Sequence, residues 1–417
     1  MKIAIVGSGI SGLGAAYLLN EAGHDICMYE KNDYIGGHSR TIEVNIDNSN
    51  IAVDTGFIVF NYKNYPCLTA LFKHLDVSID KSDMSFGVSI KNGWFEYGTK
   101  RLSGLLAQKS NLLNIKFWRM VFDIVKFNAK AKKYINSNIT LGECLKDLNL
   151  SSWFKDYYLL AMGSAIWSTS KNSMLDFPAR SFIRFFDNHG LLTISDQPQW
   201  YTVSGGSREY IKKLTSSFRH KILLNCAAKK VIRKNNKITV IDTNGNSSDF
   251  DHIIFACHSD QAIEILDSPT KEEIDIIGSI KYQENKIIVH TDESFMPKRR
   301  SAWASWVYLS EEKNDINSEI SLSYWMNNLQ NINSHVPIII TLNPSKSPNK
   351  SKILDENIFE HPVFDEQAII AQDKISNIQG LNNTWYCGAY LKYGFHEDGL
   401  ASGIKIAEKL GAKIPWK

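Results

Sequence analysis

Three glycines near the start of the chain have the spacing of a turn that binds phosphate groups. Gly7, Gly9 and Gly12 follow an apolar run at residues 2–6 and precede an Ala- and Leu-rich helical pattern. In such a turn the first glycine permits the bend, the second lets a pyrophosphate approach the backbone, and the third lets helix pack on sheet. The phosphates then lie at the helix N-terminus, so this segment predicts a dinucleotide-binding βαβ unit.

An acidic residue closes the second strand of this unit. Glu30 ends the run 25–30 and lies 18 residues after Gly12, where a carboxylate accepts hydrogen bonds from ribose hydroxyls. This position favours an adenosine with a free 2′-hydroxyl over one with a 2′-phosphate. Ser11 and Lys31, which neighbour these residues, are assigned to the same dinucleotide site.

A second glycine turn follows directly, and it bears on which dinucleotide is bound. Residues 36–41 read Gly-Gly-His-Ser-Arg-Thr, and residues 54–57 read Asp-Thr-Gly-Phe. Dehydrogenases that use NAD do not need such a stretch. Here the chain resembles the flavin-containing amine oxidase and phytoene desaturase superfamily, in which a Gly-Gly-Arg-like segment helps to hold the FAD pyrophosphate. The resemblance assigns six residues to an FAD site: Gly37, His38, Arg40, Thr55, Gly56 and Phe57.

The arginine of that family pattern is displaced in this chain. His38 stands directly after the two glycines, and the nearest arginine is Arg40. A guanidinium group clamps phosphate with two parallel hydrogen bonds, so Arg40 is the candidate for this role. The alternative is a surface cation in a loop.

The end and the middle of the chain extend the resemblance. Residues 384–389 resemble the superfamily's last strand and glycine turn, and residues 394–403 resemble the start of its last helix, whose N-terminus stabilises negative charge on reduced flavin. The family positions carried over here are Gly388, Gly399 and Leu400. The run 222–231 resembles a strand in which the position of Val231 contacts adenine through its backbone. A core strand valine is the alternative for Val231.

Two side chains are candidates for catalysis. Lys286 begins an apolar strand, and its placement resembles the amine oxidase lysine that approaches flavin N5 through a water and supports reoxidation. The alternative is a solvent-facing lysine. His396 stands near the place where amine oxidases have one wall of an aromatic cage, and an imidazole can move a proton at neutral pH. The alternative is a structural histidine.

The histidines lack metal-ligand spacing, so we expect no metal site.

The length and the order of these segments predict two interleaved domains. A chain of 417 residues exceeds the usual size of one domain. We predict an α/β fold with a Rossmann-like FAD-binding domain, built on a parallel sheet, from residues 1–62, 198–285 and 380–417. Residues 63–197 and 286–379 contain a hairpin signal, helical patterns and β-rich runs, and they are predicted to form an α+β substrate domain.

Charge, cysteine content and hydropathy indicate which partners and which cellular compartment to expect. The net charge of +3 is too small to argue for nucleic acid, and no basic stripe resembles a nucleic-acid module. The six cysteines show no paired short spacing, so we expect free thiols in a reducing, cytoplasmic compartment. No run of 18 apolar residues indicates a spanning helix.

One predicted helix, at residues 112–135, is both basic and amphipathic. Its cations include Lys116, Arg119, Lys126 and Lys130. Phe117 and Trp118 are among the apolar residues between them, and their rings would insert into a bilayer if the helix were an interfacial anchor on the inner face of the membrane. The alternative is a helix packed on the domain with a solvated basic face.

A more detailed resemblance points toward the substrate. Residues 54–61, 165–168, 185–191 and 393–399 resemble a bacterial subgroup of predicted NAD/FAD-binding proteins whose relatives occur beside cyclopropane-fatty-acid synthases. This implies a non-covalently bound FAD and hydride transfer to flavin N5 from a hydrophobic substrate, with a lipid acyl chain as the first candidate. A flavin amine oxidase acting on a small amine is one alternative. A non-catalytic flavoprotein partner of a lipid methyltransferase is the second.

Overall fold

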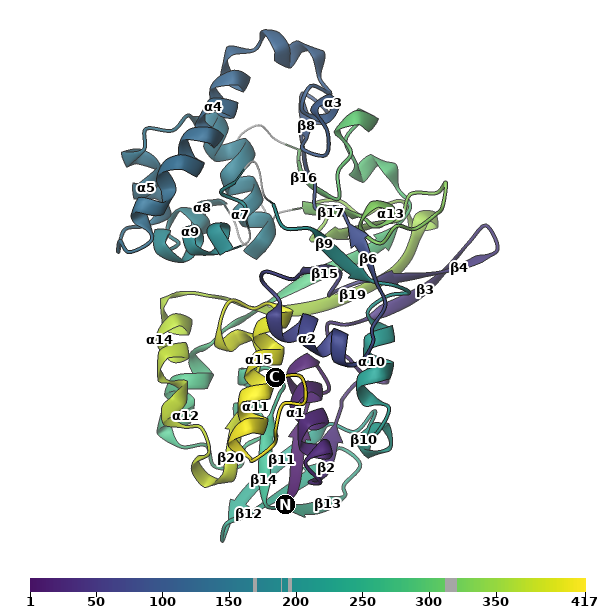
Figure 1. Ribbon diagram of the computed structural model, residues 1–417, viewed down its shortest axis with the longest axis vertical. Coiled ribbons are helices and arrows are strands. Elements are labelled where there is room, and N and C mark those ends of the chain that lie inside the picture. The colour runs from purple at the N-terminus through teal and green to yellow at the C-terminus, as the bar shows by residue number, and fades with distance from the viewer. Residues whose placement is uncertain (168–170, 189, 194–196, 312–320) are drawn as a thin grey trace.

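The structure of the protein is a computed structural model. It describes residues 1–167, 171–188, 190–193, 197–311 and 321–417. Ser168 and His189, which belong to two of the sequence motifs named above, lie outside the described residues. In Figure 1 the N-terminus lies at one end of the long axis, beside a parallel sheet, and a group of helices occupies the opposite end.

A five-stranded sheet contains the predicted βαβ unit. Its strand order is β10-β2-β1-β14-β20, and every neighbouring pair is parallel. The strands are β1 (Lys2–Val6), β2 (Asp25–Tyr29), β10 (Ile222–Leu223), β14 (His252–Phe255) and β20 (Thr384–Tyr386). The prediction of an α/β fold built on a parallel sheet is therefore confirmed.

Both faces of this sheet are buried, as is usual for parallel strands. Ile3 and Ile5 pack into the core beneath α1 (Ile10–Glu21) and α15 (His396–Lys409), whereas Ala4 and Val6 point into the opposite core. That second core is covered by the three-stranded antiparallel sheet β11–β13 and by helices. Its elements are β11 (Ala228–Lys234), β12 (Lys237–Asp242), β13 (Ser247–Phe250), α11 (Ser259–Ile265), α12 (Lys271–Ile276) and α14 (Glu366–Lys374).

Helices α1 and α15 lie side by side, although they begin almost 400 residues apart (Figure 1). A methyl group built on Gly403 would overlap the carbonyl oxygen of Ser11, and one built on Gly14 would lie 2.5 Å from Leu400 Cδ1. This close packing brings the two helix N-termini to the same edge of the parallel sheet.

A second, seven-stranded sheet forms the other half of the molecule. Its order is β19-β15-β18-β17-β16-β7-β8, and only the β7–β16 pair is parallel among its described neighbours. The strands are β7 (Phe86–Ile90), β8 (Phe95–Gly98), β15 (Tyr282–His290), β16 (Trp306–Ser310), β17 (Ser321–Trp325), β18 (Ile339–Leu342) and β19 (Ile353–Pro362). Two distant parts of the chain therefore share one sheet.

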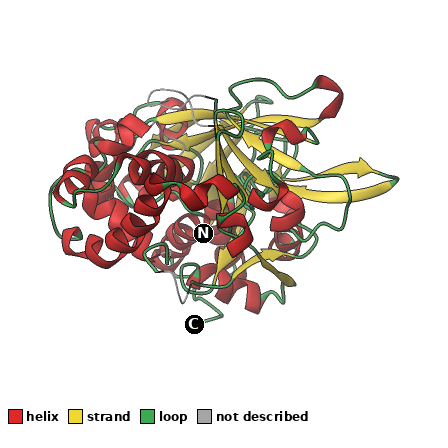
Figure 2. Cartoon of the chain, turned by 90° about the horizontal axis from the view of Figure 1, so that it is seen from above, coloured by secondary structure: helices red, strands yellow, loops and turns green. Residues whose placement is uncertain are grey.

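A helical lobe packs against one side of this sheet, and Figure 2 shows helices gathered on one side and long strands on the other. Its helices include α4 (Ile115–Lys130), α5 (Leu141–Asp147), α7 (Leu160–Trp167), α8 (Lys171–Leu175) and α9 (Ala179–Asn188). No helix among the described residues combines the length and apolarity needed to cross a bilayer.

Smaller elements connect the two halves. They are β3 (Thr41–Ile46), β4 (Ser49–Asp54), β5 (Phe60–Asn61), α2 (Pro66–His74), β6 (Ile79–Ser82), β9 (Trp200–Val203) and α10 (Arg208–Thr215). The strands of the parallel sheet fall within the three segments assigned to the FAD-binding domain. The small sheet β5-β9-β6, however, joins segments assigned to both domains, and the predicted domain boundaries stay a prediction.

Candidate functional site

The turn between β1 and α1 has open space beside its middle glycine. Gly7 has a φ of +101°, a conformation that favours glycine. Gly9 is different, because its φ of −70° and ψ of 175° suit any residue, and a methyl group built on it would meet no atom within 4 Å. Neither backbone strain nor packing within the protein accounts for glycine here. The open space leaves the backbone at Gly9 accessible to an approaching group.

The second glycine turn packs against the first and borders this open space. Gly36 N donates a hydrogen bond to Ser8 O (3.0 Å), and a methyl group built on Gly37 would lie 3.1 Å from Gly9 Cα. Helix α1 begins at this point without a side-chain cap, so its first backbone N–H groups are available to an anion. We name the space between Gly7–Gly12 and Gly36–Gly37 the Gly9 cradle.

Glu30 holds the first turn in shape. Its carboxylate accepts hydrogen bonds from Ser8 N (2.9 Å), Ser8 Oγ (2.6 Å) and Asn32 N (2.9 Å), and the residue is 5% exposed. A carboxylate offers about four acceptor positions, so one remains for a ribose hydroxyl. Lys31 is exposed beside it. The ribose role of Glu30 and the dinucleotide role of Lys31 stay predictions.

His38 lies at the other side of the Gly9 cradle, in a group of aromatic rings. Its imidazole stacks on Phe359 with 4.5 Å between ring centroids and lies 5.4 Å from the ring of His361. Burial and the nearby histidines lower the pKa of His38 well below its usual value, so the ring is neutral at physiological pH. Its buried Nε2 has no hydrogen-bond partner among the described residues. An unpartnered ring nitrogen next to an open glycine turn fits a bound polar group such as FAD.

Arg40 and the segment 55–57 are tied to this turn. Arg40 directs its two guanidinium nitrogens at Asp355 in β19 (2.7 and 3.1 Å), and this pairing raises the pKa of Arg40. Thr55 N donates to Arg40 O, and Phe57 N donates to His38 O, both at 2.8 Å. A methyl group on Gly56 would overlap the His38 carbonyl. The structure thus brings these predicted residues together, and the role of Arg40 as a phosphate clamp stays a prediction.

Helix α15 brings the predicted residues near the end of the chain to the glycine turn at the start of α1. Gly388 N donates a hydrogen bond to Ser402 Oγ (2.9 Å), and a methyl group built on Gly399 would lie 2.9 Å from Ser11 Oγ. Leu400 is fully buried. Gly399 and Leu400 therefore lie in the first two turns of α15, packed against the first two turns of α1.

His396 is held between an aromatic ring and two hydroxyl groups. Its ring stacks on Phe57 with 3.9 Å between centroids and 11° between planes. Its Nε2 lies 2.7 Å from the Tyr210 hydroxyl and 3.3 Å from Ser39 Oγ. Burial lowers the pKa of His396 to about 3, so the imidazole is uncharged at neutral pH. Tyr210 was not predicted from the sequence, although it lies just after the glycine pair at residues 205–206.

Replacing His396 with Asn is expected to reduce the acid sensitivity of the fold. The imidazole has a pKa of about 3 in the folded state and about 6.5 in an unfolded chain, so the unfolded state binds the extra proton as pH falls. The wild type should lose roughly 1–2 kcal/mol between about pH 7 and about pH 5 through this residue. Urea titrations of both proteins at these two pH values measure the difference. An identical pH dependence would contradict the assigned environment of His396.

Lys286 and Val231 are not brought together with these residues. Lys286 is 47% exposed, and its Nζ lies 2.9 Å from Glu356 on the adjacent strand β19. Its neighbour Asn285 points to the other face of β15, where it is buried and lies 3.1 Å from His361 Nδ1. Val231 is buried in the core below the parallel sheet, and its carbonyl accepts a hydrogen bond from Asp267 N (2.9 Å). This geometry gives no support to the predicted roles of Lys286 and Val231, which stay untested.

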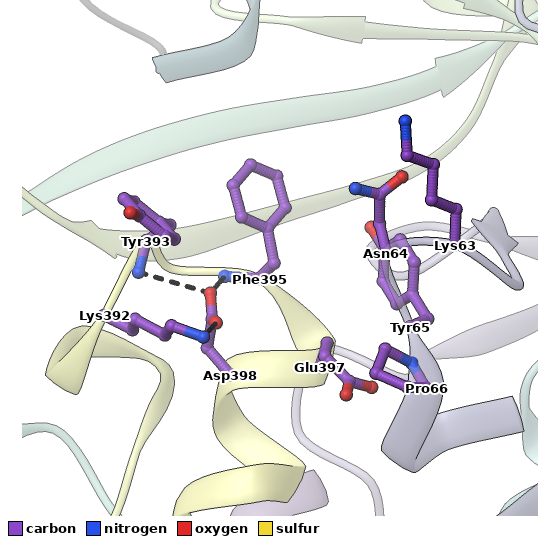
Figure 3. A pocket seen from close by; sticks show the side chains of 9 residues that line it. All are labelled: Lys63, Asn64, Tyr65, Pro66, Lys392, Tyr393, Phe395, Glu397 and Asp398. Carbon is purple, nitrogen blue, oxygen red and sulfur yellow. Dashed lines mark hydrogen bonds and ion pairs between the residues drawn. The ribbon is translucent and has the colours of Figure 1, made fainter. Parts of the chain in front are cut away.

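A cavity of about 280 Å³ lies where α15 and α2 begin (Figure 3). Glu397 accepts hydrogen bonds from Cys67 N and Leu68 N at the start of α2, and Asp398 accepts one from Phe395 N. Burial raises the pKa of both carboxyl groups. The cavity is lined by Lys63, Asn64, Tyr65, Pro66, Lys392, Tyr393, Phe395, Glu397 and Asp398. It therefore adjoins His396 and combines rings, carboxylates and cations.

The structure gives the surroundings of the cysteines and of the groups that could bind a metal ion. All six cysteines are free, and Cys387, directly after β20, is fully buried. Among the residues that the structure describes, no three His, Cys, Asp or Glu side chains gather closely enough to hold a metal ion.

Sequence comparison relates the chain to flavoenzymes. A family model described as flavin containing amine oxidoreductase matches residues 10–342. The chain is 35% identical over 77 residues to 15-cis-phytoene desaturase from Synechococcus elongatus, which is 18% of this chain and 15% of that protein. It is 49% identical over 43 residues to 1-hydroxycarotenoid 3,4-desaturase from Flavobacterium sp., 10% of this chain and 9% of that protein. The matches thus span less than a fifth of these curated relatives.

Solved structures share the whole fold. A CLA-producing fatty acid isomerase from P. acnes has a TM-score of 0.69 at 15% identity, with 98% of both chains covered. Putrescine oxidase bound to putrescine also has a TM-score of 0.69, at 12% identity, with 98% of this chain and 99% of that chain covered. At such low identities these similarities show the fold alone.

Proposed function

Because this chain belongs to the flavin-containing amine oxidoreductase family, we propose that it is an FAD-dependent oxidoreductase that removes a hydride from the acyl chain of a lipid. When bound, FAD would supply the hydride acceptor at its N5 atom. The observation that carries the cofactor assignment is the open space at Gly9 beside the unpartnered Nε2 of His38.

The residues around the Gly9 cradle have distinct proposed tasks. The backbone of Gly9 and the uncapped N-terminus of α1 would hold the pyrophosphate, and Glu30 would accept a ribose hydroxyl. The N-terminus of α15, at Gly399, would stabilise negative charge on the flavin. His396, stacked on Phe57 and uncharged, would line the site without offering a proton at neutral pH.

Three observations support a lipid as the substrate. The short sequence matches are to carotenoid desaturases, one solved structure of the same fold is a fatty acid isomerase, and four motifs resemble the subgroup found beside cyclopropane-fatty-acid synthases. A lipid substrate would reach the protein from a bilayer, so the proposal includes peripheral contact with a membrane.

The amine oxidase alternative rests on the family model and on the shared fold with putrescine oxidase. An aromatic cage for an amine needs two ring faces with space between them. At His396 one ring face is already covered by Phe57. His396 therefore offers at most one ring face to an amine cage.

Anaerobic reduction of the bound flavin separates the candidates. Phospholipids with unsaturated or methylated acyl chains are expected to bleach the yellow absorbance, whereas primary amines and polyamines are not. Phospholipids with short saturated chains are the matched control, because they offer the same head group. Bleaching by putrescine but not by any lipid would establish the amine oxidase alternative, and no bleaching by either class would favour the non-catalytic flavoprotein.

A further inference from the structure

Helix α4 exposes a row of apolar side chains that no described residue covers. Ile115, Trp118, Phe122 and Val125 are separated by 3, 4 and 3 residues, which places them on one face of the helix. Their exposed fractions are 84%, 45%, 66% and 47%, and Leu113, just before the helix, is 91% exposed. Contiguous apolar exposure of this kind marks a surface that contacts another partner.

The opposite face of α4 buries three of its apolar residues. Phe117, Met120 and Phe127 are fully buried in the core of the helical lobe. The prediction that the ring of Phe117 would insert into a bilayer is therefore wrong, because Phe117 packs inward. Trp118 points outward as predicted, and its Nε1 donates to Leu112 O (2.9 Å).

Positive charge runs along one edge of the exposed row. Arg119, Lys126 and Lys130 are separated by 7 and 4 residues and so form a second row on the helix, next to the apolar one. The structure describes every residue from 109 to 130, and the single acidic side chain in that range, Asp123, is buried and accepts a hydrogen bond from Ser151 N. The outward surface of α4 is therefore apolar and cationic. Figure 1 shows α4 far from the N-terminus, at the end of the molecule formed by the helical lobe.

From this arrangement we infer that the exposed face of α4 docks on the surface of an anionic phospholipid bilayer. Trp118, Phe122 and Ile115 enter the boundary between head groups and acyl chains, and Arg119 and Lys130 meet the lipid phosphates. The charge of the surface favours this partner, because the phosphates of anionic lipids attract cations that border an apolar row and the described stretch 109–130 exposes no acidic side chain to repel them. The inference does not depend on flavin chemistry, since binding to lipid is measured without turnover.

Flotation of the intact flavoprotein with vesicles tests the inference. Vesicles of phosphatidylcholine with about a third phosphatidylglycerol should retain the protein at low salt, and high salt or pure phosphatidylcholine should weaken retention at least tenfold. The double variant Trp118→Ser/Phe122→Ser should lose binding at least tenfold while keeping its flavin and its melting temperature. Ile274→Ser/Ile358→Ser, which removes two exposed apolar residues elsewhere, is the matched control and should bind like the wild type.

A charge variant tests the second row. Arg119→Glu/Lys130→Glu should release the protein from anionic vesicles, and the control Lys405→Glu/Lys413→Glu, with exposed lysines in and after α15, should not. Equal losses in control and test variants, or no vesicle binding by the wild type, would overturn the inference. Self-association in the absence of lipid that the Trp118→Ser/Phe122→Ser variant abolishes would also overturn it, because the face would then join two copies of this chain.

Discussion

Replacing Gly9 with Val should yield a folded protein that purifies without its yellow colour. The backbone at Gly9 is extended, and the space beside it is open, so the folded protein accepts the side chain. The same side chain then fills the place where a pyrophosphate must approach the backbone. We expect FAD affinity to fall by more than about a hundredfold, or roughly 3 kcal/mol. Absorbance and fluorescence titration with added FAD measure this loss.

Gly278 provides the control for that substitution. It lies outside the site, and a methyl group built on it would meet only Ile side chains, at 3.7 and 3.8 Å. Gly9→Ala and Gly278→Ala add the same methyl group, and only the former should weaken FAD binding. Retention of FAD by Gly9→Val at wild-type affinity would remove the cradle from the cofactor site.

Replacing Glu30 with Ala should weaken FAD binding by about tenfold or more and should also lower the stability of the flavin-free protein. The substitution removes the acceptor proposed for the ribose, and it leaves Ser8 N, Ser8 Oγ and Asn32 N without their present partner. Each buried donor left unsatisfied costs about 1–3 kcal/mol. Thermal unfolding with and without FAD separates the two effects.

Glu30→Gln serves as the conservative comparison, because the amide keeps one acceptor oxygen and nearly the same shape. It should restore most of the stability of the flavin-free protein but not the full affinity for FAD. Wild-type affinity in both variants would show that Glu30 shapes the turn without contacting the cofactor.

Local patterns were sufficient to predict the parts of the fold that depend on short sequence spacing. The strand at residues 2–6 and the glycine turn before α1 appear where the sequence places them, because each follows from apolar runs and glycine positions within a few residues. The hairpin signal expected in the predicted substrate domain lies at residues 85–97, where the turn Lys91-Asn92-Gly93 joins β7 and β8. These features need no information from distant segments.

Side-chain direction and long-range packing could not be predicted in the same way. The helix predicted at residues 112–135 is shorter in the structure, where α4 ends at Lys130. The helical lobe that packs on α4 determines which face of the helix is buried. Phe117 points inward for this reason. Lys286 opens an apolar run, yet strand alternation and pairing with β19 place it beside Glu356 on the exposed face. His361, 5.4 Å from His38, had no sequence signal, because only the pairing of β15 with β19 brings it there.

The identity of the cofactor released from the wild-type protein decides whether the protein binds FAD non-covalently. The protein is to be denatured with acid, and the supernatant and the precipitate are then analysed by mass spectrometry. We expect intact FAD in the supernatant, about one molecule per chain, because no described side chain is assigned to a covalent link and the Gly9 cradle offers backbone contacts to the pyrophosphate. NAD in place of FAD, or a flavin that stays attached to the precipitated chain, would contradict it.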